Sequence, residues 1–178
     1  MALEERWNRR KLARWAFVVL VLACLLPVVV RTLISDRGPF VDVVDVIGMT
    51  RSVSLRDMKA GNVLRRQGEY ENQYGNWRDA GTYAGVLLSD LLDDVDYTAV
   101  EVVAEDGYRV TIERERIEDP DYPVILAFSM DGVDVPQWED GFRIAVLPED
   151  ERVSNEEYDA VSAGSYWVKN VVRLVVLP

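Results

Sequence analysis

The feature that most constrains this chain is an uncharged apolar run near the N-terminus, residues 15–30 (WAFVVLVLACLLPVVV), which ends at Arg31. A helix over this run extends about 24 Å, a little less than the roughly 30 Å hydrocarbon core of a bilayer. Arginines on both sides can reach toward the headgroups, and further apolar residues follow Arg31. We therefore predict a single transmembrane helix over residues 15–34.

Three other interpretations explain this run less well. A cleaved signal peptide needs a small-residue cleavage site, and residues 28–30 are all valine. A lipoprotein signal is suggested by residues 21–24 (VLAC), but the apolar run continues past Cys24. A buried core helix of a soluble domain would show one polar face, and this run has none.

The charges around the run predict its orientation. Residues 1–14 carry a net charge of +3, whereas residues 31–178 carry −14. Because basic flanks stay on the cytoplasmic side, the C-terminal part is expected to lie outside the cell membrane. The expected organisation is a cytoplasmic basic flank (1–14), a transmembrane helix (15–34), a linker (35–40) and an extracytoplasmic module (41–178).

Composition excludes several functions. The whole chain has a formal net charge of −11, which argues against nucleic-acid binding. It contains no histidine, so His-based triads, most zinc sites and the usual general base are ruled out. The single cysteine, Cys24, excludes an intrachain disulfide and cysteine-rich metal clusters. Carboxylate, arginine, tyrosine and backbone chemistry remain.

Local patterns predict a β-rich mixed domain after the linker. Ser54 precedes LRDM as a helix N-cap, and residues 86–92, with leucines at helical spacing, predict an amphipathic helix. The predicted strands are 40–49, 99–104, 108–112, 124–128, 142–147 and 166–177. The two strands around Asp106-Gly107 form a predicted hairpin, and the apolar last strand is expected to be central in its sheet.

Two segments are predicted to be loops. Residues 65–82 are polar and rich in Gly, Asn and Tyr, and residues 149–164 are acidic without periodicity. Aromatic residues gather around the first of these loops: Tyr70, Tyr74, Trp77 and Tyr83. They are equally consistent with a lid over a pocket, an anchor for a partner or a structural plug. Arginines 65, 66 and 78 make this stretch locally basic.

Six short segments follow one another in a characteristic order. They are 47–48 (IG) with 54–55 (SL), 84–92 (AGVLLSDLL), 104–108 (AEDGY), 125–127 (ILA) with 131–132 (DG), 141–148 (GFRIAVLP) and 167–170 (WVKN). Together they resemble the molybdopterin-binding domain of the sulfite oxidase family over residues 41–178. The resemblance implies an α+β fold, a β-rich mixed domain of the sulfite oxidase molybdopterin-domain type, here preceded by one N-terminal transmembrane helix.

The chain departs from this family at the metal ligand. Family members present a cysteine in a loop resembling C-x-G-N-x-R, and the matching residues 73–78 read QYGNWR, with Gln73 in the place of the cysteine. An amide cannot act as the anionic soft ligand that a thiolate provides. Cys24 lies in the predicted span and cannot substitute. We therefore expect neither a metal site nor a bound cofactor, with molybdopterin as the alternative.

The resemblance also indicates a candidate ligand or cofactor cleft. In the family, the pocket is lined by the metal-binding loop, the G-x-x-R strand and the C-terminal W-V-K segment, with cations facing an anionic pterin phosphate. The matching residues here are Asn76, Arg78, Arg143, Trp167 and Lys169. We expect Arg78, Arg143 and Lys169 to converge on one cleft under the aromatic loop, although pairing of these cations with nearby carboxylates remains the alternative.

Acidic clusters admit other functions. The aspartates at 90, 93, 94 and 96, and the acids at 131, 134, 139 and 140, suggest either calcium sites or solvated turns; no EF-hand spacing is present. A carboxylate pair for glycoside hydrolysis stays open, because it depends on spatial separation.

The function most consistent with these features is a membrane-anchored, extracytoplasmic, non-catalytic binding or accessory module. Its expected partners are the membrane and either a protein subunit or a small anionic ligand. The alternative is a molybdopterin-dependent oxidoreductase that retains its cofactor without a cysteine ligand.

Overall fold

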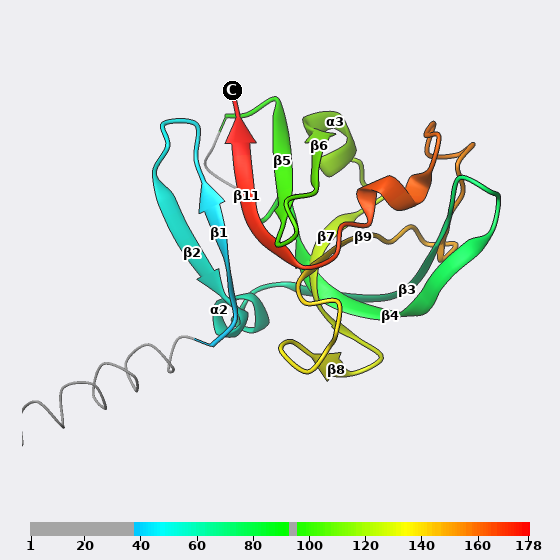
Figure 1. Cartoon of the computed structure of the whole chain (residues 1–178), viewed down its shortest axis with the longest axis horizontal. Helices are drawn as coiled ribbons and strands as arrows, with labels where there is room; N and C mark the ends of the chain where they lie inside the picture. The colour runs from blue at the N-terminus through cyan, green and yellow to red at the C-terminus, as the bar shows by residue number, and fades with distance from the viewer. Residues whose placement is uncertain (1–37, 93–95) are drawn as a thin grey trace, which may run out of the picture. The chain divides into compact units, whose positions relative to one another are not determined.

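Two β-sheets organise residues 38–92 and 96–178, the part of the chain that the computed structural model describes. The strands of the first sheet lie in the order β2 (Thr50–Ser54), β1 (Phe40–Val44), β11 (Val171–Leu177), β5 (Ala99–Ala104) and β6 (Arg109–Glu113) (Figure 1). Strand β11 pairs in parallel with β1 and antiparallel with β5, so the last strand is central in its sheet. That prediction is confirmed.

The second sheet is built around a long hairpin. Its strands lie in the order β10 (Arg152–Val153), β3 (Val63–Glu71), β4 (Trp77–Leu87), β7 (Val124–Met130) and β8 (Val133–Asp134), with β9 (Arg143–Val146) paired to β7. Strands β3 and β4 curve together across Figure 1 and end in a turn far from β7. The hairpin therefore places its own turn at the periphery and its middle beside β9 and the segment before β11.

Apolar side chains from both sheets form one core. Val100 and Val102 of β5 and Leu174 of β11 are fully buried, as are Leu126 of β7 and Ile144 of β9. Burying a side chain of this kind contributes about 1.5–3 kcal/mol. The continuous apolar runs of β7 and β9 fit strands that are covered on both faces.

The helices of the described residues are short: α2 (Leu55–Ala60), α3 (Arg114–Ile117) and the 3₁₀ turn η1 (Ala163–Tyr166). The predicted N-cap is confirmed, because the Ser54 hydroxyl accepts the Asp57 amide and the Asp57 carboxylate accepts the Ser54 amide. The hydrogen bonds from Ser54 hold the pKa of Asp57 below its ordinary value. Met58 anchors α2 in the core.

The predicted hairpin around Asp106-Gly107 is confirmed. It joins β5 to β6, with Val103 opposite Arg109. Gly107 adopts a φ of 88°, which glycine reaches without strain. The Asp106 Oδ1 atom accepts the Tyr108 amide and fixes the turn.

The prediction of a loop over residues 65–82 is wrong, because most of this segment belongs to β3 and β4. Only residues 72–76 turn. Its polar composition is misleading, since this hairpin exposes many of its side chains. Its glycines permit close packing: a Cβ on Gly68 would overlap Leu147 and approach Trp167.

The prediction of a helix over residues 86–92 is also wrong. Val86 lies in β4 opposite Leu126, and Gly85 packs so closely on the Leu126 carbonyl that a Cβ would overlap it. The following residues form turns that bury Leu88 and Leu92. The spacing of apolar residues alone cannot distinguish a strand end followed by turns from an amphipathic helix.

The segment 149–164 is only partly the exposed loop that its sequence predicts. Its strand β10 pairs in parallel with β3, and Val153 is fully buried. Tyr158 is 4% exposed, with its ring in contact with Tyr122 and Tyr166. The buried side chains of Val153 and Tyr158 thus anchor residues 149–164 on the domain, although this acidic segment has no periodic hydrophobic pattern.

The predicted transmembrane helix over residues 15–34 lies outside the described residues. Within residues 38–92 and 96–178, no helix has the length and apolar character needed to cross a membrane. The described residues after Gly38 form one compact unit.

Candidate functional site

Arg143 is the largest fully buried side chain among the described residues, and it carries a charge. It begins β9 with its side chain 0% exposed. Its Nη2 atom donates to Asp79 at 2.5 Å, and its Nη1 atom donates to Asp140 at 2.8 Å. Two carboxylates therefore neutralise the guanidinium inside the domain.

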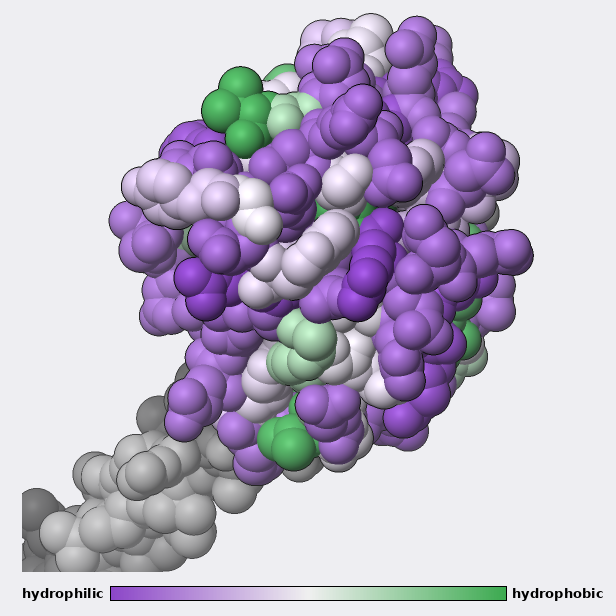
Figure 2. All heavy atoms as spheres, turned by 90° about the vertical axis from the view of Figure 1, so that its right-hand side faces the viewer, coloured by the Kyte–Doolittle hydropathy of each residue, from purple (hydrophilic) through white to green (hydrophobic). Residues whose placement is uncertain are grey.

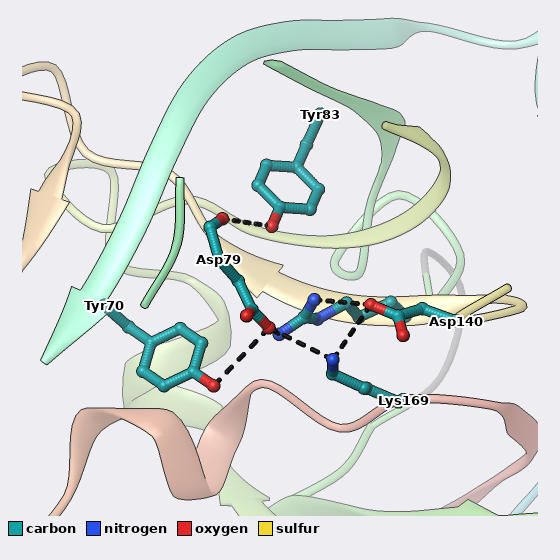
Figure 3. Close-up of polar contacts among 6 residues, drawn as sticks. Tyr70, Asp79, Tyr83, Asp140 and Lys169 are labelled. Atoms are coloured by element: carbon teal, nitrogen blue, oxygen red, sulfur yellow. Dashed lines mark hydrogen bonds and ion pairs between the residues drawn. The ribbon is translucent and has the colours of Figure 1, made fainter. Parts of the chain in front are cut away.

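Lys169 closes these contacts into a ring (Figure 3). Its Nζ atom lies 3.2 Å from Asp79 Oδ2 and 3.1 Å from Asp140 Oδ2. We call Asp79, Asp140, Arg143 and Lys169 the charge ring. It contains two cations and two anions, so its formal charge is zero.

Local backbone geometry brings the two aspartates to the ring. Asp79 interrupts β4 with a φ of 54°, opposite the register shift in β3 between Gly68 and Tyr70. Asp140 lies in the turn before β9, where its carbonyl accepts the Asn170 amide at 2.7 Å. A left-handed conformation at a non-glycine residue is costly, and the ion pairs of Asp79 offset that cost.

Three aromatic rings surround the guanidinium. The Arg143 Cζ atom lies 5.3 Å from the ring centre of Trp167, 5.8 Å from that of Tyr83 and 5.9 Å from that of Tyr70. These distances allow cation–π attraction. The Tyr83 hydroxyl donates to the Asp79 carbonyl at 2.5 Å, and Tyr70 reaches the Asp79 carboxylate at 3.5 Å.

Burial and ion pairing shift the pKa values of Asp79 and of the two tyrosines beside it. Burial alone would raise the pKa of Asp79, but hydrogen bonds and ion pairs with Arg143 and Lys169 outweigh it and hold that pKa below the ordinary value. Burial raises the pKa of Tyr83 and of Tyr70. At neutral pH the Asp79 carboxylate is therefore ionised, and the Tyr70 and Tyr83 hydroxyls are protonated.

The structure brings together three of the five residues expected in the cleft: Arg143, Trp167 and Lys169. Asn76 and Arg78 are exposed near the β3–β4 turn. Within the described residues, no hydrogen bond or ion pair joins the side chains of Asn76 or Arg78 to the other three. Arg143 and Lys169 are paired with carboxylates, which is the alternative that the sequence left open.

Gln73 lies at the exposed turn of this hairpin, which we call the hairpin tip (residues 72–76). The Asn72 Oδ1 atom accepts the amides of Tyr74 and Asn76, and Gly75 has a φ of 75°. Tyr74 is 77% exposed. The face of the molecule toward which the hairpin points is mostly hydrophilic, with apolar residues in small separate spots (Figure 2).

A groove of about 470 Å³ lies beside the charge ring. It is lined by Ala104, Glu105, Asp106, Tyr108, Val168, Lys169 and Asn170. The Glu105 amide donates to the Asn170 carbonyl, which ties the β5–β6 turn to the segment before β11. Lys169 belongs to both features, so the groove adjoins the ring.

Sequence reasoning missed Asp79 and the role of Asp140. The sequence places Asp140 among the acids that flank turns, and no motif or spacing marks Asp79. Two sequence features could have indicated these ion pairs: lysine is scarce in the chain, which draws attention to Lys169, and Asp140 lies three residues before Arg143. Among the described residues, no three carboxylate or cysteine side chains are placed to hold a metal ion.

Comparison with solved structures shows what the fold is similar to. The crystal structure of the sulfane dehydrogenase SoxCD from Paracoccus pantotrophus aligns with a TM-score of 0.58 at 16% sequence identity. The domain has a sulfite oxidase-like fold. The alignment covers 78% of this chain but only 38% of the dehydrogenase chain, so the chain spans well under half of that protein. No protein-family model and no curated protein matches the sequence.

The described residues do not fit a cysteine-ligated molybdopterin. They contain no cysteine, and the residue matched to the ligand position, Gln73, sits on an exposed turn. Arg143, which the resemblance aims at an anionic cofactor, is enclosed by two carboxylates and three aromatic rings. Its Nη1 and Nη2 atoms donate to Asp140 and Asp79, and its Nε atom is buried without a hydrogen-bond partner among the described residues, so the guanidinium presents no exposed donor to an anion.

Proposed function

We propose that this chain is a membrane-anchored, extracytoplasmic binding or accessory module that uses a sulfite oxidase-like fold without redox chemistry of its own. The observation that supports this most strongly is the charge ring. The two cations that a cofactor site would need, Arg143 and Lys169, are neutralised within the domain by Asp79 and Asp140.

The location is part of this proposal. The apolar run of residues 15–34 follows a flank of net charge +3, which favours a cytoplasmic N-terminus. The acidic remainder is then outward-facing. The hydrophilic hairpin face and the groove beside the charge ring are surfaces on which such a module would meet a partner.

Metal and pterin content test the absence of redox chemistry. The full chain should be produced in a host that makes molybdopterin, purified in detergent, and analysed for molybdenum by mass spectrometry and for pterin by fluorescence after oxidation. We expect neither at stoichiometric level, because the donor set lacks a thiolate. About one molybdenum per chain would favour the oxidoreductase alternative, and co-purifying proteins in the same sample would identify an accessory role.

Protease accessibility tests the topology. A protease added to intact cells, or to spheroplasts where an outer membrane is present, should cleave the domain while a cytoplasmic control protein stays intact. Cleavage only after lysis would show that the orientation is reversed.

A further inference from the structure

The groove beside the charge ring has an apolar floor and an acidic rim. Ala104 and Val168, on its floor, are 5% and 3% exposed. Glu105 and Asp106, on its rim, are exposed at the β5–β6 turn. The groove therefore combines a surface for methylene groups with two carboxylates at its edge.

The charge available to a ligand in this groove is negative. Lys169 is the one cation among the lining residues, and its ammonium lies between Asp79 and Asp140. Asp106 uses Oδ1 for the Tyr108 amide, which leaves Oδ2. Within the described residues, no hydrogen bond or ion pair occupies the Glu105 carboxylate. An anionic ligand is therefore disfavoured here and a cationic one is favoured.

Tyr108 adds a feature that suits a guanidinium or ammonium group. Tyr108 is 48% exposed and lines the groove, while its hydroxyl donates to the Ser165 carbonyl at 3.3 Å. A cation over the face of a tyrosine ring gains attraction that grows when the site is partly desolvated. A planar guanidinium can stack on this ring and also bond a carboxylate.

The domain as a whole favours the same class of ligand. Residues 38–178 carry a formal net charge of −15. A negative domain accelerates encounter with basic partners and disfavours acidic ones. Since exposed charges more than about 8 Å apart are screened at physiological salt, the residues at the groove itself must provide the specific part of the affinity.

We propose that this groove receives an arginine side chain from a basic segment of a partner protein. The guanidinium stacks on Tyr108 and pairs with Glu105 and Asp106, and its methylene stem lies on Ala104 and Val168. This inference rests on the proposed binding role, of which it names the surface and the chemistry of the partner.

Binding of a hexaarginine peptide to the full chain in detergent tests the proposal. Fluorescence anisotropy at about 0.15 M salt should show saturable binding. The double variant Glu105→Gln/Asp106→Asn keeps the turn acceptor at position 106 and removes both charges; we expect it to weaken binding about tenfold. Tyr108→Leu should weaken binding about fivefold, whereas Tyr108→Phe keeps the ring and should change it less than about twofold.

A matched control separates this site from general electrostatics. Glu149→Gln/Glu156→Gln removes two exposed carboxylates that do not line the groove, so it should weaken binding less than about twofold. Equal losses in both double variants, wild-type affinity after the groove substitutions, or no saturable binding would each overturn the proposal.

The same preparation distinguishes this failure from failure of the proposed function. Stoichiometric molybdenum together with groove-dependent peptide binding would leave the groove assignment standing and remove the non-catalytic role. A metal-free protein whose peptide affinity does not change in the Tyr108 variants would leave the non-catalytic role standing and would contradict the groove assignment.

Discussion

The charge ring and the hairpin tip are two regions that the sequence predicted to form one site, and they differ in almost every physical respect. The ring holds its guanidinium at 0% exposure among four ion pairs and three aromatic rings. The tip exposes Tyr74 and Gln73, and its turn is held by the backbone amides of Tyr74 and Asn76, which donate to the Asn72 side chain. The guanidinium of the ring is thus part of the core, with Lys169 at its exposed edge, whereas the tip residues lie on the surface.

This difference explains why residues that match the family's cofactor pocket need not form such a pocket here. A pocket that binds an anion needs cations with free hydrogen-bond donors. In the ring, each cation already meets two carboxylates, and the Nε atom of Arg143, which has no hydrogen-bond partner among the described residues, is buried. Arg143 and Lys169, which match cations of the family's cofactor pocket, are present, but their ion pairs with two aspartates indicate that they stabilise the fold. Substitutions in the two regions should therefore differ in their effect on the free energy of unfolding.

The largest expected effect is that of Arg143→Ala. The substitution removes the buried partner of Asp79 and Asp140 and leaves Lys169 as the cation that they share. Breaking a buried ion pair in this way costs about 3–5 kcal/mol. Thermal unfolding of the full chain in detergent, followed by circular dichroism, would show a large fall in Tm.

The matched control is Arg78→Ala beside the hairpin tip. Its side chain is exposed, so the change in the free energy of unfolding should stay within about 0.5 kcal/mol. If Arg143→Ala unfolded at the temperature of the wild type, the ring would not be structural, and a ligand site at Arg143 would regain support.

A smaller effect is expected from Asp79→Asn, and it depends on pH. Because the folded-state pKa of Asp79 lies below its ordinary value of 3.8, the ionised carboxylate stabilises the fold above that value. This stabilisation is lost as the pH falls through the lowered pKa. At neutral pH we expect Asp79→Asn to cost about 1–3 kcal/mol.

The difference between wild type and Asp79→Asn should then shrink as the pH is lowered below 3.8. Urea unfolding at a series of pH values measures it. Asp121→Asn, at an exposed carboxylate, should show no such convergence. A constant difference over the whole range would mean that Asp79 acts through its backbone conformation instead of its charge.

The sequence predicted those parts of the fold that depend on short-range chemistry. The Asp106-Gly107 hairpin, the Ser54 cap and the central last strand follow from turn residues, a capping pattern and an apolar run. The sequence failed where long-range packing decides. Strand β4 passes through a segment with helical spacing, because pairing with β7 selects the extended form of residues 85–87.

The candidate site shows the same division. The resemblance brought forward Arg143, Trp167 and Lys169, which the structure places together. It could not show that Asp79 would turn inward, because that depends on a left-handed residue opposite an irregularity in β3. Residue composition predicts neither the left-handed conformation of Asp79 nor the irregularity in β3.

The smallest expected effect is that of Gln73→Cys, which restores the residue type that the resemblance expects at this position. The Gln73 side chain is exposed on the hairpin tip, so the free energy of unfolding should change by less than about 0.5 kcal/mol. The new thiol should react readily with a maleimide reagent, since it is accessible; a Cys24→Ser background removes the native thiol from the assay. We expect this variant to remain free of molybdenum, because Arg143 and Lys169 stay bound to Asp79 and Asp140. Stoichiometric molybdenum in Gln73→Cys, measured under the conditions used for the wild type, would show that the tip and the ring can still assemble one cofactor site. That result would unite the two regions that the structure separates.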